Sequence, residues 1–322
     1  MKAQRDTFIS GLFEKAKKDK DIYLISVDMG APSLDRWREE LPEQFFAAGI
    51  SEQNAINFAA GLSASGKKPY VYFMAAWVAR CFEQIRYSCA MAKNPVTILG
   101  NGVALGYAPA GPAHEPNEDL AYMRSLCNIE IYSPCNNNVV SRLVDLTVDK
   151  PRLRYLRLER KYATELDSLY QDMTQEELES GIALVKQASP SGASKGKVCV
   201  LSSGYMLGRC SDLVTRLESD GYEACLVDMW KVKPIDTSAF EKCVKDCDTI
   251  VTVEEQTLSG GFGSSVCETL VDLRIQKPVL RIGLPERYIF ENGSRDYHID
   301  NNGLSVDSLR EKVISFLSNT KL

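Results

Sequence analysis

A lone acidic residue, Glu52, opens a segment of small and apolar residues, a position that suits proton-transfer chemistry. Ser51 is a residue type that often caps a helix, and an acid in the first turn is stabilised by the helix dipole. Residues 55–64 are mostly apolar, so we expect a helix buried on most of its faces. Burial would raise the pKa of the Glu52 carboxyl unless a cation pairs with it. Glu52 could therefore stabilise the helix start or share a proton with a ligand nitrogen.

Three further features follow strands that the sequence predicts in the first half of the chain. They are Asp28 after residues 22–27, the segment from Phe73 to Trp77 after residues 69–74, and the loop 101–117 after residues 96–100. Parallel sheets bind ligands outside the carboxyl ends of their strands. His114, one of two histidines in the chain, lies in the loop, where a ligand contact is favoured. Trp77 taken alone indicates only core packing.

Helical and buried-strand patterns alternate along the chain, which predicts an α/β fold with parallel sheets covered on both faces. In the first half we expect strands at 22–27, 69–74, 96–100, 129–132 and 154–158, and helices at 5–19, from Glu52 onward, at 76–92, 117–125 and 136–148. In the second half we expect strands at 198–201, 224–227, 249–253 and 279–282, and helices at 207–219, 262–273 and 305–318.

The alternation breaks between the two halves. Residues 165–179 are acidic, and residues 189–194 form a Ser, Pro and Gly turn cluster. We therefore predict a first domain at 1–160, a connecting segment at 161–195 and a smaller α/β domain at 196–322. A chain of 322 residues accommodates two domains of ordinary size.

Composition narrows the possible partners and the compartment. A net charge of -5 argues against nucleic acid as a partner. Neither a membrane span nor a signal peptide is visible, so we expect no membrane partner. The ten cysteines are dispersed, without a CxxC motif or a Cys/His cluster, which disfavours a zinc site. Reduced, buried thiols in a cytoplasmic protein are the expectation.

Several motifs, in the right order along essentially the whole chain, resemble the thiamine-diphosphate enzymes of the transketolase group. The segment 49–54 with 59–62 is similar to the pyrimidine-binding segment of that group, and residues 77–86 to a segment that begins with an aromatic residue and ends in Asp/Glu-Gln-Ile. Residues 111–114 and 118–124 are similar to its histidine loop and the next helix. In the second half of the chain, residues 232–236 and 253–263 are also similar to segments of that group.

The resemblance implies a role for each candidate side chain. The glutamate at the position of Glu52 hydrogen-bonds the aminopyrimidine of thiamine diphosphate and promotes its imino tautomer, which deprotonates the thiazolium carbon. The acid must lie in a dry pocket to keep a proton to share. The remaining assignments are Trp77 stacking on the pyrimidine, Phe73, Met74, Arg80 and Asp28 lining the cofactor site, His114 contacting substrate oxygens, and Arg160 and Arg5 near a substrate phosphate.

One element of the group is missing from this sequence. The group holds the diphosphate through Mg²⁺ bound by a Gly-Asp-Gly motif on a separate domain, and no Gly-Asp-Gly occurs here. The Gly-rich stretch 260–265 opens a helix and could suggest a phosphate site, but the resemblance places it in the C-terminal domain as a structural element. We therefore expect a separate N-terminal subunit to supply the diphosphate and Mg²⁺ site, with assembly into a heterotetramer.

The loop departs from the transketolase pattern at three positions. Ala110 replaces an Asp, Ala113 replaces the Thr of Gly-Pro-Thr-His, and a second histidine of the loop is replaced near Gly102. Lost polar contacts shift substrate specificity strongly. We therefore expect a ketol transfer on an unusual sugar or sugar phosphate, with ordinary pentose phosphates as poor substrates.

Three alternatives remain open at this point. The β-subunit of a 2-oxoacid dehydrogenase has the same two domains, although its Gln-His-Ser loop is lacking here. A deoxyxylulose-phosphate-synthase-like ketol or acyl transferase is a second possibility. The third, a non-catalytic partner subunit, is disfavoured by the presence of Glu52 and His114.

Overall fold

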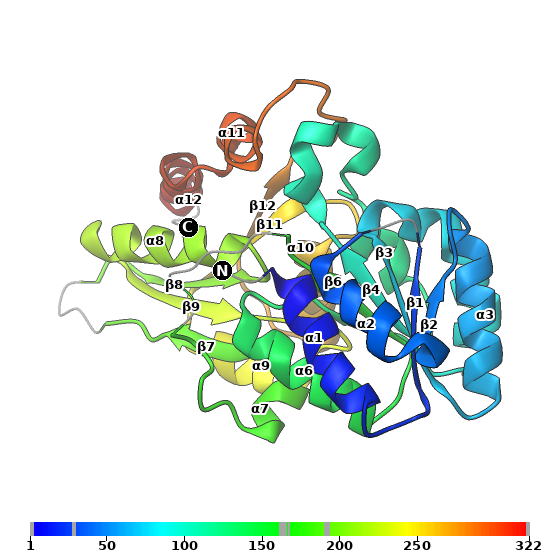
Figure 1. The fold of residues 1–322 in the computed structure, drawn as a ribbon. Helices are drawn as coiled ribbons and strands as arrows, with labels where there is room; N and C mark the ends of the chain where they lie inside the picture. The colour runs from blue at the N-terminus through cyan, green and yellow to red at the C-terminus, as the bar shows by residue number, and fades with distance from the viewer. Residues whose placement is uncertain (1–2, 28–29, 161–165, 167, 190–193, 320–322) are drawn as a thin grey trace.

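The computed structural model contains two mostly parallel sheets flanked by helices, which confirms the predicted α/β class (Figure 1). It describes residues 3–27, 30–160, 166, 168–189 and 194–319. The seven-stranded sheet has the order β10-β5-β6-β4-β3-β1-β2, and the five-stranded sheet has the order β12-β11-β8-β9-β7. Within the described ranges, no helix is long and apolar enough to cross a membrane.

The elements have the following bounds. The first sheet contains β1 (Ile22–Ser26), β2 (Phe45–Ala47), β3 (Lys68–Met74), β4 (Thr97–Asn101), β5 (Glu130–Tyr132), β6 (Arg154–Leu158) and β10 (Lys231–Lys233), and the second contains β7 (Ala183–Lys186), β8 (Lys197–Ser202), β9 (Glu223–Asp228), β11 (Thr249–Thr257) and β12 (Val279–Leu284). The α-helices are α1 (Gln4–Ala16), α2 (Asp35–Glu40), α3 (Glu52–Ala64), α4 (Phe82–Gln84), α5 (Asp119–Arg124), α6 (Asn137–Asp149), α7 (Gln175–Ser180), α8 (Met206–Ser219), α9 (Thr237–Val244), α10 (Phe262–Asp272), α11 (Arg295–Ile299) and α12 (Val306–Asn319). Short 3₁₀ and π segments are η1 (Pro32–Leu34), η2 (Pro42–Gln44), η3 (Ala75–Cys81), η4 (Ile85–Met91), η5 (Ala104–Ala110), η6 (Pro112–His114) and η8 (Asp300–Leu304).

The central strands of the first sheet run parallel, so their carboxyl ends meet along one edge. Strands β6, β4, β3, β1 and β2 pair in parallel, in that order. Of the described candidates in the first domain, Glu52, Trp77, Arg80, His114 and Arg160 follow these strands, Phe73 and Met74 end β3, and Arg5 lies on α1. The topology therefore brings the predicted site to a single edge, as expected for a parallel sheet.

Two edge strands cross the limits that the sequence suggested. Strand β10, from the second half of the chain, pairs antiparallel with β5 of the first sheet. Strand β7 lies inside the predicted connecting segment and pairs antiparallel with β9. Each has only three or four residues, too few for an alternating pattern to be recognised. The two halves are therefore joined by strand pairing as well as by side-chain contacts.

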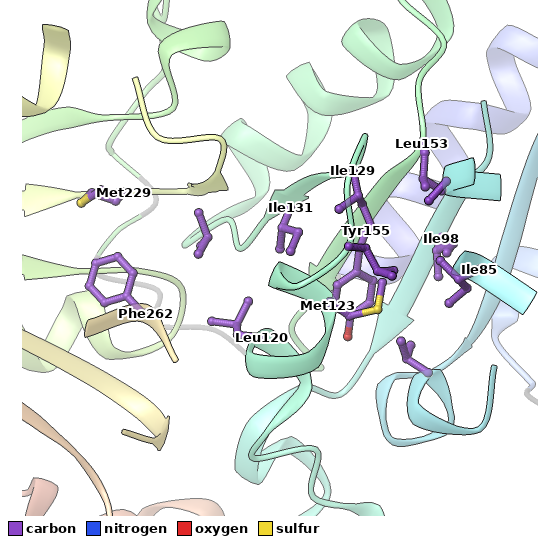
Figure 2. Close-up of a cluster of buried hydrophobic side chains, with 14 of the residues drawn as sticks. Ile85, Ile98, Leu120, Met123, Ile129, Ile131, Leu153, Tyr155, Met229 and Phe262 are labelled. Atoms are coloured by element: carbon purple, nitrogen blue, oxygen red, sulfur yellow. The ribbon is translucent and has the colours of Figure 1, made fainter. Parts of the chain in front are cut away.

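The apolar core runs without interruption from one half into the other. One cluster contains buried side chains of α3, β3 and α5 together with those of β8, β9 and α10. Figure 2 shows Phe262, from the second half, next to Leu120 of α5, and Met229 farther along the same cluster. A second cluster, on the opposite face of the first sheet, includes apolar residues of α1 and α6. The shared core fixes the position of α5, which follows the histidine loop.

Asp119, at the start of α5, joins the two halves through a fully buried carboxylate. Its Oδ2 accepts hydrogen bonds from Tyr155 Oη at 2.7 Å and Arg157 Nε at 2.9 Å. Its Oδ1 accepts from its neighbour Leu120 N at 2.8 Å and from Gln256 Nε2 on β11. A buried carboxylate with a cation and several donors satisfies the requirement for burying charge. The start of α5 is therefore tied to both sheets.

Arg295, at the start of α11, forms a second charged contact between the halves. Its Nη1 donates to Glu159 Oε2, just after β6, at 2.7 Å, and its Nε donates to Glu255 Oε1 on β11 at 2.7 Å. The guanidinium also lies 3.6 Å from the ring centroid of Tyr205. Burial raises the pKa of the Glu255 carboxyl; Arg295 opposes this rise, and the Glu159 charge adds to it. Arg295 therefore offsets the repulsion between the buried carboxylates of Glu159 and Glu255.

We expect Arg295→Met to lower the free energy of unfolding by about 3–5 kcal/mol, because it leaves two buried carboxylates without their cation. The loss should be smaller at pH 5 than at pH 8. A carboxyl whose pKa is raised in the folded state costs stability when ionised, and this cost disappears as the pH falls through the folded-state pKa. Urea unfolding at both pH values measures the effect.

Arg310→Met is the matched control for this variant. Arg310 pairs with Asp220 at 2.6 Å in a solvent-accessible position on α12, so its loss should cost far less stability than the loss of Arg295. A loss for Arg295→Met no greater than that of Arg310→Met would contradict the interpretation of Arg295 as a buried clamp.

Candidate functional site

Glu52 is the first residue of α3, and its side chain is only 4 % exposed. Ser51 occupies the N-cap position, as predicted, but its hydroxyl donates to the Ala48 carbonyl at 2.6 Å instead of capping the helix. The Glu52 carboxylate is paired: Arg80 Nη1 donates to its Oε2 at 3.1 Å. Arg80 therefore supplies the cation that can pair with a buried carboxylate at this position.

The prediction that α3 is buried on most of its faces is wrong for this chain. Asn54, Asn57, Phe58 and Gly61 form an exposed strip along the helix, while Ala55, Ile56, Ala59 and Ala60 face the core. The composition of the helix does not reveal this, because small and apolar residues occur on both faces. The strip remains open to solvent among the residues that the structure describes.

Trp77 and Arg80 lie in η3, where the sequence predicted part of one continuous helix at 76–92. The structure instead contains a 3₁₀ segment, one α-helical turn and a π segment in succession. Side chains three residues apart eclipse one another in a 3₁₀ helix. Accordingly, the Arg80 guanidinium lies 5.0 Å from the Trp77 ring centroid. The irregular helix therefore directs an aromatic ring and a cation toward the Glu52 carboxylate.

His114, in η6, lies on the other side of Trp77. The two ring centroids are 5.4 Å apart in an edge-to-face arrangement. The Nδ1 atom of His114 is buried and has no hydrogen-bond partner among the residues that the structure describes. Glu52, Arg80, Trp77 and His114 thus form a continuous row of contacts, assembled from three segments far apart in the sequence.

Phe73 and Met74 end β3 and differ in their surroundings. Phe73 is fully buried in the apolar cluster shared by the two halves, whereas Met74 is half-buried. Successive residues of a strand point to opposite faces, so the two side chains do not share a surface. Asp28, the remaining cofactor candidate, lies outside the described residues.

Arg5 and Arg160, far apart in sequence, both approach Tyr107 in η5. The Arg160 guanidinium lies 4.8 Å from the Tyr107 ring centroid, and Arg5, which pairs with Asp6 at 3.4 Å, lies near the phenols of Tyr107 and Tyr72. Asn101 Nδ2 donates to the Tyr107 hydroxyl at 2.7 Å and fixes the ring. Tyr107 is not among the site residues that the sequence predicts, because an aromatic residue in a Gly- and Pro-rich loop has no distinctive spacing.

Gly102 leaves the space that Tyr107 fills. A Cβ at position 102 would overlap the Tyr107 ring, and the backbone has a positive φ of 73°. Both features favour glycine. The ring of Tyr107 therefore covers Gly102, near which the transketolase group has a second histidine. This phenol lies near two arginines.

Glu115 directly follows His114 and is also missing from the sequence predictions. It is buried, and its Oε2 has no hydrogen-bond partner within the described part of the chain. Burial raises the pKa of Glu115 to about 7; Asn117 opposes the rise, and the charge of Glu255 adds to it. The histidine loop therefore contains a carboxyl that titrates near neutral pH.

The Gly-rich stretch at 260–265 is occupied by the protein itself. The Glu254 carboxylate accepts from Phe262 N at 2.6 Å and Gly263 N at 2.8 Å, the positions that an anion at the start of α10 would use. Gly260 has a positive φ, and a Cβ there would lie 2.8 Å from Ala121 of α5. The glycines thus allow close packing against α5. Among the described residues, no group of three or more His, Cys, Asp or Glu side chains could hold a metal ion.

Comparison with known proteins adds the following. Residues 2–164 match the family model of the transketolase pyrimidine-binding domain, and residues 192–309 match the model of the transketolase C-terminal domain. The chain is 32 % identical over 315 residues to one of the subunits of the apulose-4-phosphate transketolase of Phocaeicola vulgatus, covering 96 % of this chain and 97 % of that one. It is 28 % identical to the 1-deoxy-D-xylulose-5-phosphate synthase of Methylacidiphilum infernorum but spans only 49 % of its length.

Solved structures give a similar result. A split-gene transketolase described as an inactive β4 tetramer superimposes with a TM-score of 0.84 at 28 % identity, covering 98 % of each chain. A transketolase variant from Pichia stipitis superimposes with a TM-score of 0.79 at 17 % identity, covering 46 % of that chain, and shows the fold alone.

Proposed function

Because the chain belongs to the transketolase family, we propose that it is one subunit of a two-chain, thiamine-diphosphate-dependent ketol transferase. In this proposal, residues 1–160 are the pyrimidine-binding domain, residues 161–195 connect the domains, and residues 196–322 are the C-terminal domain. The observation that carries the proposal is the contact row Glu52–Arg80–Trp77–His114 at the carboxyl edge of the first sheet. We place the assembly in the cytoplasm.

The side chains in this row have the chemistry that the cofactor requires. Thiamine diphosphate supplies the carbon centre that accepts the two-carbon ketol group. Glu52 offers a nearly buried carboxyl for a ring nitrogen of the aminopyrimidine, and Trp77 offers an aromatic surface beside it. In this chain the Glu52 Oε2 is bound by Arg80, so the ring nitrogen must use the other oxygen or displace the guanidinium.

His114 and the two arginines would act on the substrate. The His114 imidazole, whose Nδ1 has no hydrogen-bond partner within the described residues, can exchange a proton with a substrate oxygen, and Glu115 beside it can hold a further proton near pH 7. Arg5 and Arg160 flank Tyr107 and would bind the anionic end of a sugar phosphate, with the Tyr107 hydroxyl as an additional polar contact. Met74 and Asp28 complete the proposed cofactor surroundings, and the buried Phe73 supports them from the core.

A second subunit is required for the diphosphate and Mg²⁺. The sequence contains no Gly-Asp-Gly motif, and the start of α10, the Gly-rich alternative, is filled by Glu254. The exposed strip of α3 and neighbouring apolar side chains offer a surface for association; Ile50 is 73 % exposed and Phe58 is 39 % exposed. Phe46 packs against Phe58 at 4.8 Å, and Tyr87 and Met91 on η4 extend this surface. We propose that an N-terminal-type subunit and a second copy of this chain complete a heterotetramer.

Glu52→Gln should lower kcat of the reconstituted pair by about 10²–10⁴-fold, because an amide keeps the shape but cannot share an acidic proton. The measurement is turnover with saturating cofactor, together with the assembly state of the pair. Glu39→Gln, at an exposed position on α2, is the matched control and should leave kcat unchanged. Intact turnover in Glu52→Gln would favour a non-catalytic role for this chain.

Isothermal calorimetry should detect tight binding of thiamine diphosphate with Mg²⁺ only when both subunits are mixed. Each chain alone lacks half of the contacts, and an unanchored diphosphate leaves only the pyrimidine surface for binding. Titration of each chain and of the mixture under the same conditions provides the comparison. Tight binding by this chain alone would refute the two-subunit site.

The substrate should differ from that of an ordinary transketolase. Ala110 and Ala113 offer no polar side chain, and Gly102 is covered by Tyr107, so contacts to donor hydroxyls and phosphate are rearranged. The similarity to part of an apulose-4-phosphate transketolase supports an unusual ketose phosphate as the donor. We expect xylulose 5-phosphate with ribose 5-phosphate to be turned over poorly by the pair. A panel of ketose phosphates tests this, and efficient pentose-phosphate turnover would contradict it.

Adding pyruvate and branched 2-oxoacids to this panel distinguishes the alternative chemistries. Decarboxylation of pyruvate with an aldose phosphate acceptor would assign the pair to the deoxyxylulose-phosphate-synthase type, which the half-length similarity to those enzymes also allows. Decarboxylation of branched 2-oxoacids would assign it to the 2-oxoacid dehydrogenase type. Activity with ketose phosphates alone is the expected result.

A further inference from the structure

Four cysteines gather in the second half of the chain, on elements that contain none of the candidate site residues. Cys199 on β8 and Cys225 on β9 are in register on neighbouring parallel strands, so their side chains share one face of the sheet. Cys243 lies on α9, and Cys247 follows this helix. The Cys199 thiol donates to the Cys243 carbonyl at 3.9 Å and lies beside the thiols of Cys225 and Cys247.

A lysine ammonium is held beside one of these sulfurs. Lys277 Nζ lies 3.8 Å from Cys247 Sγ. It donates to the carbonyl oxygens of Val244 at 2.8 Å and Lys245 at 2.7 Å, so it is fixed at the end of α9. The neighbouring Cys199 thiol lowers the pKa of Cys247, burial opposes this, the Lys277 charge lowers the pKa further, and the Asp248 charge raises it. The Cys247 thiol itself donates to the Val244 carbonyl at 3.0 Å. A thiol beside a fixed cation has the character of a reactive cysteine.

A surface pocket opens beside three of the four cysteines. Its volume is about 470 Å³, and it is lined by Cys225, Cys243 and Cys247. Cys199 is fully buried behind them. In contrast, burial raises the pKa of Cys81, Cys89 and Cys210 to about 12, as expected for inert core thiols. The fixed Lys277 cation and the thiol whose pKa is lowered thus lie together at this pocket.

We propose that Cys247 and Cys199 form a peroxide-reactive thiol pair, in which Cys247 is oxidised first and Cys199 resolves it to a disulfide. The Cys247 thiolate attacks one oxygen of hydrogen peroxide; the S–O bond forms, the O–O bond breaks, and the departing hydroxide takes up a proton to become water. The Cys199 sulfur then attacks Cys247, the S–S bond forms, and the second oxygen leaves as water with the Cys199 proton. Two thiols and one peroxide give one disulfide and two waters. A small dithiol reductant reverses the reaction.

The test uses the full-length chain, treated with one equivalent of hydrogen peroxide and mapped by peptide mass spectrometry. We expect a Cys199–Cys247 disulfide as the main product. In Cys199→Ser the intermediate cannot be resolved, so dimedone should label Cys247 several-fold faster than Cys127. Cys127 is an exposed cysteine of the same chain and serves as the internal reference for simple accessibility.

Lys277→Met should slow disulfide formation several-fold, because it removes the cation fixed beside the Cys247 sulfur. Lys245→Met is the matched control and should leave the rate unchanged, because Lys245 is an exposed lysine of the neighbouring segment. This comparison keeps Cys199 intact, so the proposal stays testable if Cys199→Ser fails to fold. A Cys199–Cys225 bridge as the main product, or labelling of Cys247 no faster than that of Cys127, would overturn the assignment. Because the reaction needs neither cofactor nor sugar, its failure is distinguishable from a failure of the proposed transferase function.

Discussion

The buried carboxylate of Asp119 is the contact on which the geometry of the histidine loop depends. It ties the start of α5 to β6 through Tyr155 and Arg157 and to β11 through Gln256. The loop between β4 and α5 is held at its other end by α11, which packs against η5. The second half of the chain therefore has a direct role at the site: it restrains both ends of a loop that provides Tyr107 and His114.

This restraint concentrates acidic groups at the junction of the two halves. Glu115, Glu254 and Glu255 are all buried there, and burial raises the pKa of each carboxyl. Arg157 and Arg295 compensate for part of the charge, and the backbone N–H groups of α10 compensate for Glu254. The pKa of Glu115 and that of Glu254 are raised to about 7, and ionised carboxylates are costly in a buried setting. The protonation state of the junction and the position of the histidine loop are thus physically coupled.

The sequence predicted the parts of this structure that depend on local patterns. Long buried strands and helices such as β11 and α8 have clear periodicity, and the motif around Glu52 lies at the start of a helix as expected. The break of residues 76–92 into 3₁₀, α and π segments could not be predicted, because apolar spacing does not distinguish these helix types over a few residues. Pairing of β10 with β5 depends on tertiary contacts between the halves. The Glu52–Arg80 pair and the position of Tyr107 likewise depend on tertiary contacts, which local sequence patterns do not reveal.

The Glu52–Arg80 pair bears on why such a site would be divided between two chains. In this chain alone, one oxygen of the carboxylate binds a guanidinium that is itself half exposed and lies against Trp77. A cofactor nitrogen that approaches Glu52 must compete with this cation, and the pyrimidine surface alone provides little binding free energy for the exchange. A partner that anchors the diphosphate adds the missing interactions and raises the effective concentration of the pyrimidine at Glu52. The Glu52–Arg80 pair therefore has two effects in the proposed complex. It satisfies the carboxylate before assembly, and it makes cofactor binding depend on assembly.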